Sequence, residues 1–163
     1  MRSRLSLLFA SLLLVPLVWA LPVQATKTPG DHPNANPPTE ITIEPEGNQM
    51  KFATKEFTVS PGEEVRLVFE NTADSPAMIH NVVFLTTSDD GVVKEVGQAG
   101  ASAGAASGYV PDHDAILAAT DVAKPGETVE VTFTAPETSG EYTYVCTYPG
   151  HWATMQGTMR VEN

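Results

Sequence analysis

The sequence has one cysteine and few basic residues, and each shortage excludes a class of protein. Cys146 has no second cysteine with which to form an internal disulfide. Lys and Arg number 9 against 20 Asp and Glu, which gives a net charge of −11. Such a chain repels the phosphates of nucleic acids and anionic membranes. We therefore predict no nucleic-acid partner and expect basic protein surfaces to attract it.

The first 25 residues are typical of a secretory signal peptide. Arg2 and Arg4 precede an apolar run over residues 5–20, and small residues end the segment at Ala25. We predict cleavage after Ala25 and an exported, periplasmic or extracytoplasmic protein. The alternative is an uncleaved membrane anchor, because the apolar run approaches the roughly 18 residues of a membrane span.

The rest of the chain divides into a linker at 26–40 and one domain at 41–163. The linker is rich in proline and has almost no apolar residues, which predicts a flexible segment. Within the domain, short runs of alternating apolar and polar residues lie between proline- and glycine-containing turns. This pattern predicts an all-β sandwich or barrel. The expected strands are residues 56–59, 64–71, 79–86, 127–136, 140–148 and 157–162.

Two stretches do not follow the strand pattern. Residues 97–108, GQAGASAGAASG, are nearly all small, so they form either a short helix or a loop. Residues 111–121 form either a helical turn after Pro111 or an irregular strand.

A possible metal site is concentrated in the stretch CTYPGHWATM, where Cys146, His151 and Met155 follow a C-x4-H-x3-M spacing. Thiolate, imidazole and thioether suit copper, and Cu(I) especially, better than Mg²⁺ or Ca²⁺. Such a site needs one more strong ligand, and His80 at the start of an apolar strand is the obvious candidate. His113 lies between two aspartates and is expected on the surface instead.

These residues carry a resemblance to a known family. CTYPGHWATM followed by QGTMRVE resembles the copper loop of azurins, while HNVVF and GEYTYVCTYPGH are similar to auracyanins. Both groups belong to the blue-copper (cupredoxin) superfamily, and the resemblance covers roughly residues 49–163. It implies a Greek-key β-sandwich, a short helical or irregular insertion around residues 90–118, and one type 1 copper ion.

The resemblance also implies a role for each site residue. His80, Cys146 and His151 would be equatorial copper ligands, and Met155 a weak axial one. The backbone carbonyl of Ile79 would add a distant contact, although azurins have glycine there. Outside the ligands, Asn81 would hydrogen-bond the Cys146 loop, and Thr147 would be a second residue that supports the site.

The function that this implies is one-electron transfer between redox proteins by a monomer that is not an enzyme. The edge of His151 would be the electron port, within a docking patch that includes Trp152, Pro149 and Met78. For Trp152 the alternative is packing back against the loop.

Two other functions are considered. One is copper delivery or buffering, although such proteins usually have open clusters of methionine or histidine. The other is thiol catalysis with Cys146 as nucleophile, for which no orienting acid or oxyanion hole is evident.

Overall fold

The computed structural model describes residues 37–163. The predicted signal peptide and residues 26–36 of the predicted linker lie outside this range. Residues 39 and 40, assigned to the linker, belong to the first strand. The elements are β1 (Thr39–Ile43), β2 (Glu56–Val59), β3 (Glu64–Glu70), β4 (Val83–Leu85), α1 (Asp90–Ala103), a 3-10 turn (Ala105–Ser107), β5 (Ile116–Ala119), β6 (Thr128–Thr134), β7 (Gly140–Val145) and β8 (Gln156–Val161).

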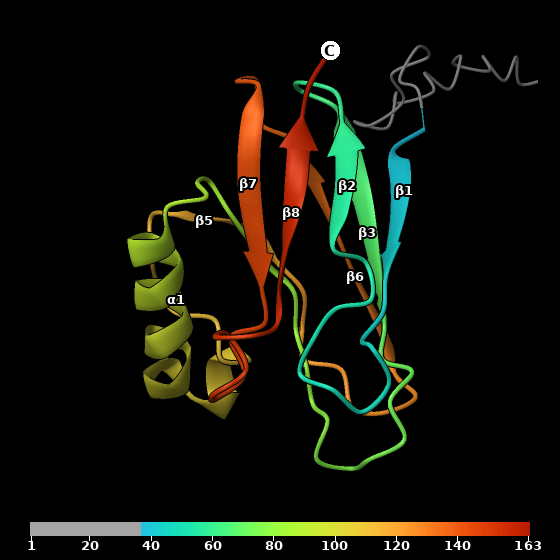
Figure 1. The fold of residues 1–163 in the computed structure, drawn as a ribbon, viewed down its shortest axis with the longest axis vertical. Helices are drawn as coiled ribbons and strands as arrows, with labels where there is room; N and C mark the ends of the chain where they lie inside the picture. The colour runs from blue at the N-terminus through green and yellow to red at the C-terminus, as the bar shows by residue number, and fades with distance from the viewer. Residues whose placement is uncertain (1–36) are drawn as a thin grey trace, which may run out of the picture. The chain divides into compact units, whose positions relative to one another are not determined.

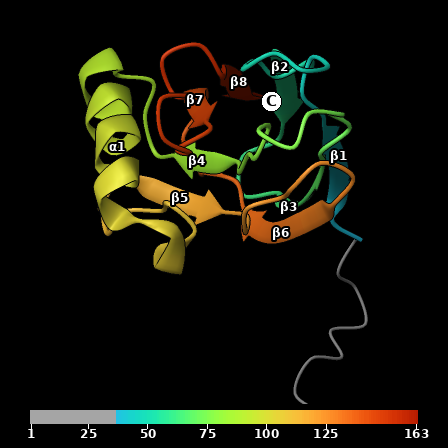
Figure 2. The same ribbon diagram turned by 90° about the horizontal axis from the view of Figure 1, so that it is seen from below.

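The strands form two sheets that face each other. One sheet has the order β1-β3-β6 and the other the order β2-β8-β7-β4-β5 (Figures 1 and 2). β1 pairs parallel to β3 and β2 parallel to β8, while the other neighbours are antiparallel. The predicted all-β sandwich is therefore confirmed. Within residues 37–163 no helix combines the length and the apolarity needed to cross a membrane.

Aromatic side chains fill the space between the sheets. Phe84 of β4 and Phe133 of β6 lie with ring centroids 4.7 Å apart. Tyr144 of β7 is fully buried, and its hydroxyl donates a hydrogen bond to the Thr54 carbonyl at 2.6 Å. Its ring passes directly over Gly157 of β8, where a Cβ atom would lie 2.1 Å from the ring. Burial of these large rings contributes much of the stabilisation of the sandwich.

The predicted insertion contains a helix, α1, which packs on the outer face of the five-stranded sheet (Figure 2). Asp89 caps its first turn by accepting hydrogen bonds from the backbone N–H groups of Gly91 and Val92. Val93 and Val96 are buried in a second core cluster with Val145 and residues of β4. The small-residue stretch thus continues α1 to Ala103 and then forms a 3-10 turn, and residues 116–119 are a strand.

Each sheet has an exposed arginine on an inner strand that joins its two neighbouring strands. Arg66 of β3 bridges β1 and β6, and Arg160 of β8 bridges β2 and β7. Their carboxylate partners are Glu40 and Glu130 for Arg66, and Glu56 and Glu141 for Arg160. These contacts join neighbouring strands on the solvent-facing sides of the sheets.

Candidate metal centre

Cys146 lies directly after β7, at the end of the sandwich where the connecting loops gather (Figure 1). Alternation along β7 turns its side chain inward, and it is fully buried. Its backbone N–H donates to the Met155 carbonyl at 3.0 Å. Burial raises the pKa of the thiol to about 12, partly offset by hydrogen bonds from the backbone N–H groups of Asn81 and Tyr148. The free thiol is therefore protonated at neutral pH, and only a strong electrophile such as a metal ion would displace its proton.

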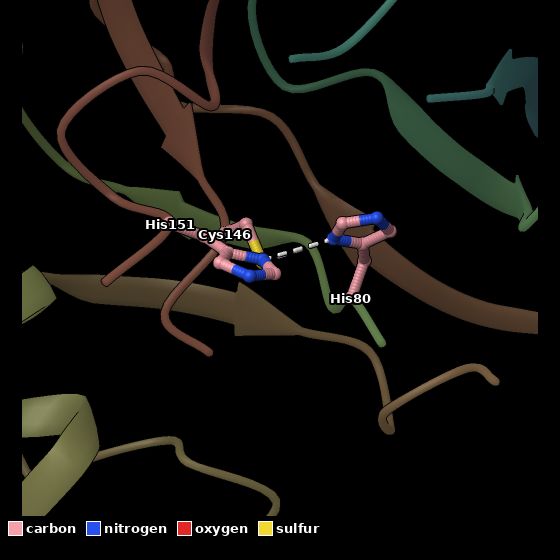
Figure 3. A group of neighbouring side chains, drawn as sticks. All are labelled: His80, Cys146 and His151. Carbon is pink, nitrogen blue, oxygen red and sulfur yellow. Dashed lines mark hydrogen bonds between the residues drawn. The ribbon is translucent and has the colours of Figure 1, made fainter. Parts of the chain in front are cut away.

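Two histidines converge on this thiol from separate loops (Figure 3). The Nδ1 atoms of His80 and His151 are 3.1 Å apart. The Cys146 Sγ atom lies 3.9 Å from His80 Nδ1 and 3.7 Å from His151 Nδ1. All three ligand atoms are within 4.8 Å of one another and all three residues are buried. The spacing is small enough for one metal ion to bind all three.

Both imidazoles are neutral in this environment. Burial, together with the nearby His151 ring, lowers the pKa of His80 to about 4. Burial also lowers the pKa of His151. A neutral imidazole has a free lone pair, which metal binding requires. Within residues 37–163 the buried Nε2 atom of His80 has no hydrogen-bond partner, so no carboxylate or carbonyl of this range holds the ring through that atom.

The loop after Cys146 is closed by its own backbone hydrogen bonds. Tyr148 O accepts from His151 N at 3.0 Å, and His151 O accepts from Met155 N at 2.9 Å. Gly150 has φ 84°, a conformation that favours glycine at this turn. The turn brings Met155, which is fully buried, back beside the Cys146 backbone. Its thioether is the fourth predicted ligand.

The segment that carries His80 is fixed in the fold by two buried asparagines. The His80 backbone forms an isolated antiparallel bridge with Ala123. Asn71 donates from Nδ2 to the carbonyl oxygens of Met78 at 2.7 Å and Ala123 at 2.9 Å. Asn71 was not among the predicted site residues, and a lone asparagine at the end of a predicted strand gives no indication of this role.

Asn81 connects the His80 segment to the Cys146 loop. Its Oδ1 accepts from Thr147 N at 2.8 Å, and its Nδ2 donates to Thr147 Oγ1 at 2.9 Å. The same Nδ2 donates to the Gly108 carbonyl at 3.0 Å, so a third segment joins the clamp. Side chains that fix the residues next to metal ligands orient the ligands and tune the metal.

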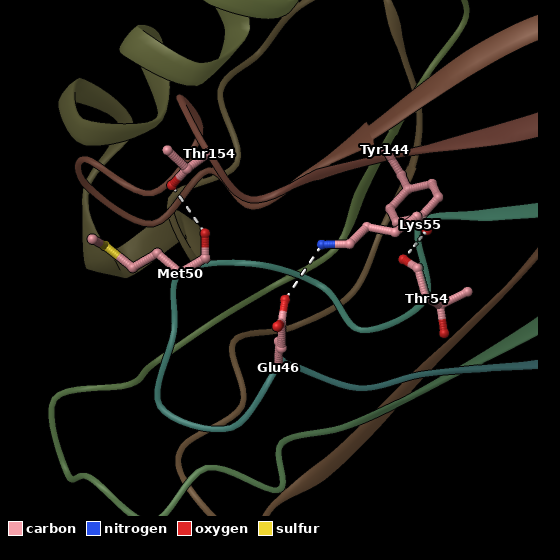
Figure 4. Close-up of polar contacts among 6 residues, drawn as sticks. All are labelled: Glu46, Met50, Thr54, Lys55, Tyr144 and Thr154. Atoms are coloured by element: carbon pink, nitrogen blue, oxygen red, sulfur yellow. Dashed lines mark hydrogen bonds and ion pairs between the residues drawn. The ribbon is translucent and has the colours of Figure 1, made fainter.

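A fourth loop, residues 44–55, touches both ligand-bearing loops. Asn48 Oδ1 accepts from the backbone N–H of Asp74 and Ser75 at 2.9 and 3.0 Å, in the loop that leads to His80. The Met50 carbonyl accepts from Thr154 Oγ1 at 2.9 Å in the other loop (Figure 4). Sequence reasoning did not find these residues, because their role depends on which loops meet in space.

The predicted docking residues lie in different surroundings. Pro149 is exposed and Met78 is partly buried. Ile79, which was predicted as a weak backbone contact to the metal and not as a docking residue, is also partly buried. Trp152 packs against α1, where a Cβ atom on Gly97 would lie 2.3 Å from the Trp152 Cγ atom. Trp152 thus packs on α1 and is partly buried. The Nε2 atom of His113 lies 3.7 Å from Glu95 Oε1, and His113 is not part of the ligand cluster.

Comparison with known proteins bears directly on this cluster. Residues 39–162 match the model of a family described as copper binding proteins, plastocyanin/azurin family. The chain belongs to this family. Family membership confirms the copper cofactor and the blue-copper electron-transfer function expected from the resemblance.

Individual members show the same relationship. Auracyanin-A of Chloroflexus aurantiacus is 41% identical over 126 residues, which are 77% of this chain and 75% of that protein. Azurin of Achromobacter denitrificans is 37% identical over 131 residues, covering 76% of this chain and 85% of the azurin. The solved structure of auracyanin A, described as a "blue" copper protein, matches with a TM-score of 0.71 at 38% identity. That match covers 77% of this chain and 100% of the auracyanin chain.

Proposed function

We propose that His80, Cys146 and His151 are the strong ligands of one type 1 copper ion and that Met155 is the weak axial ligand. The observation that carries the proposal is the convergence of one buried thiol and two buried imidazoles, whose ligand atoms lie within 4.8 Å of one another. Two nitrogens and a soft sulfur, with a thioether carried on the same loop, form a donor set that suits both oxidation states of copper. Bound copper would supply a one-electron Cu(II)/Cu(I) couple.

The contribution of the protein is to hold these side chains in one arrangement. Cys146, His151 and Met155 are on a loop that is closed by its own backbone hydrogen bonds. His80 is on a second segment, and Asn81 joins the two through Thr147. Copper ligands that the surrounding protein holds in place need to move little when the site gains or loses an electron. Electron exchange should therefore be fast.

His151 is the ligand nearest the surface and is the proposed electron port. It is 5% exposed, whereas Cys146 and His80 are 0% exposed. Pro149 and Gly150, which precede it, are exposed. We propose that a partner docks over this loop and that Met78 lies at the edge of the contact. Trp152 would contribute to this docking surface indirectly, through its packing on α1.

The partner and the location follow from charge and from the first residues of the chain. The net charge of −11 favours a redox partner with a basic surface and a transient contact. The sequence of residues 1–25 supports export. We propose an exported monomeric electron carrier without catalytic activity, because four protein ligands would leave no strong position for a substrate.

Copper delivery or buffering is the alternative, and burial of the ligands argues against it. A carrier that hands copper on needs ligands that a partner can reach, yet Cys146, His80 and Met155 are fully buried. The rate at which the Cu(I) protein loses copper to a competing chelator can be measured and compared with its rate of electron exchange. We expect electron exchange to be much the faster process.

The ligand assignment is tested by adding Cu(II) and recording visible absorption and EPR spectra. We expect an intense thiolate-to-copper absorption that ascorbate bleaches. Cys146→Ser should abolish this band, whereas the matched histidine control His113→Gln should leave it unchanged. A colourless copper complex of the wild-type protein would contradict the proposal.

A further inference from the structure

Tyr109 has an unusual backbone conformation close to the candidate metal centre. Its φ angle is 61°, and among residues 37–163 it is the only non-glycine residue with a positive φ. The left-handed region is strained for a bulky side chain. Such a conformation persists only where surrounding contacts hold it.

Those contacts come from the same elements that support the ligands. The carbonyl of Gly108, the preceding residue, accepts from Asn81 Nδ2 at 3.0 Å. Tyr109 N donates to the Gly104 carbonyl at 2.9 Å. Gly100 of α1 lies so close that a Cβ atom there would be 2.9 Å from the Tyr109 carbonyl. The insertion is thereby fixed to the residue that follows His80.

The Tyr109 ring lies at the start of a row of three rings that ends at His151. The Tyr109 and Tyr148 rings have centroids 4.9 Å apart at 69°, an edge-to-face contact. The Tyr148 and His151 rings also have centroids 4.9 Å apart, tilted by 49°. Both tyrosines are partly buried. Edge-to-face and tilted pairs at this separation are attractive beyond the area that they bury.

The His151 ring is less fully enclosed than the His80 ring. The hydrogen-bonding contacts of the His151 ring in the described chain all involve Nδ1, the atom that faces His80 and Cys146. Its other side is therefore held by ring packing, and Tyr148 supplies that contact. His80 is enclosed more fully, with no exposed surface and Phe69 against its ring.

We propose that Tyr109 is a positioning residue that holds Tyr148 against His151 and so fixes the His151 ring. The strained backbone directs the Tyr109 ring onto Tyr148, and the insertion that carries it becomes part of the support of the metal site. The proposal rests on the proposed function in that His151 is taken as a copper ligand. Tyr109 itself need not touch the metal.

The test compares three substitutions at Tyr109. Tyr109→Gly and Tyr109→Asn remove the ring while retaining residue types that accept a positive φ. Tyr109→Phe keeps the ring and removes only the hydroxyl. In the metal-free protein we expect the Gly and Asn variants to lose the NMR cross-peaks between the Tyr148 and His151 rings. Tyr109→Phe should keep them.

The copper-loaded protein gives a second measurement. Loss of the Tyr109 ring should admit water beside His151, and water favours the more highly charged oxidised site. The midpoint potential of the Gly and Asn variants should therefore fall. The change in the redox equilibrium constant should be at most about tenfold, which corresponds to about 59 mV for one electron. Tyr109→Phe should have the wild-type potential.

The outcomes separate this proposal from the ligand assignment. Unchanged ring cross-peaks and potential in the Gly and Asn variants would overturn it, and so would an equal effect in Tyr109→Phe. If neither ring-deleting variant folds, the wild-type protein decides, because absence of cross-peaks along the three rings contradicts the proposal. A failure of the proposed copper function would appear in the wild-type copper spectrum, while the metal-free NMR result would still stand.

Discussion

Two buried asparagines and two exposed arginines each join segments that lie far apart in the chain, but in opposite environments. Asn71 and Asn81 are 1% and 0% exposed and use neutral amide groups at the metal end. Arg66 and Arg160 lie on the outer faces of the sheets and use charge. An exposed ion pair contributes little because water screens it, whereas a buried hydrogen bond is costly to leave unmade.

The difference teaches how an acidic protein can support the segments of a metal site with neutral side chains. A neutral amide orients the Cys146 loop and leaves the charge of the site to the metal and the thiolate. A charged clamp would need its own buried partner and would change the charge around the metal. The charged residues are used instead on the sheet surfaces, where water stabilises them.

The largest effect is expected from Asn81→Ala. Thr147 N, Thr147 Oγ1 and the Gly108 carbonyl would lose their partner, and the free energy of unfolding should fall by about 3 kcal/mol. Urea unfolding measures this, with Asn163→Ala at the exposed end of the chain as the control. The thiolate-to-copper absorption should also change. If Asn81→Ala lowered the free energy of unfolding no more than Asn163→Ala does, the distinction between the buried asparagines and the exposed arginines would be contradicted.

Asn71→Ala should have a smaller effect, because Asn71 does not touch the Cys146 loop. Its loss leaves the Met78 and Ala123 carbonyls without this donor, and we expect about 2 kcal/mol of destabilisation. The same urea experiment measures it. A double substitution with Asn81→Ala would show whether the two clamps act together, since both hold the segment around His80. Strict additivity would indicate independent roles.

Gly97→Ala tests the contact between α1 and the metal loop. The new methyl group would meet the Trp152 side chain, and such overpacking costs about 1–3 kcal/mol. Alanine also favours the helix by up to about 1 kcal/mol, so we expect a net loss of about 1 kcal/mol. Trp152 is the only tryptophan after Trp19, so its fluorescence should shift as the ring moves. The exposed neighbour in Gln98→Ala is the control, and a stabilised Gly97→Ala protein with unchanged fluorescence would be inconsistent with this packing.

The smallest effects are expected from Arg66→Gln and Arg160→Gln. Both side chains are solvent-exposed and their ion pairs are screened. The midpoint of urea unfolding should change little, and the visible spectrum of the copper form should stay the same. A loss as large as that of Asn71→Ala would show that the surface charges matter to the fold as much as the buried amides do.

The sequence allowed the sandwich and the metal-binding chemistry to be predicted because both depend on local patterns. The alternation of apolar and polar residues in 64–71 and in 140–148 indicates strands with one buried face. The C-x4-H-x3-M spacing places three ligand types on one short loop, and the composition of the site then requires a further ligand. His80 was the candidate because it begins an apolar strand, where a charged imidazolium would be costly, whereas His113 lies between two aspartates.

The supporting contacts could not be predicted in the same way, because they depend on which segments meet. Gly97 and Gly100 lower the helix propensity of residues 97–108, so the sequence alone did not decide between a helix and a loop there. In the structure their lack of a side chain lets Trp152 and Thr147 approach the helix closely. The ring contact between Tyr109 and Tyr148 likewise needs the insertion to be folded over the loop.

X-ray absorption at the copper edge, recorded on the oxidised and the reduced protein, tests the central claim most directly. That claim is that the fold, rather than the metal, sets the positions of His80, Cys146 and His151. We therefore expect one thiolate sulfur and two imidazole nitrogens around copper in both oxidation states, with nearly unchanged distances. Loss or exchange of one of these ligands on reduction, or a site without the sulfur, would contradict it.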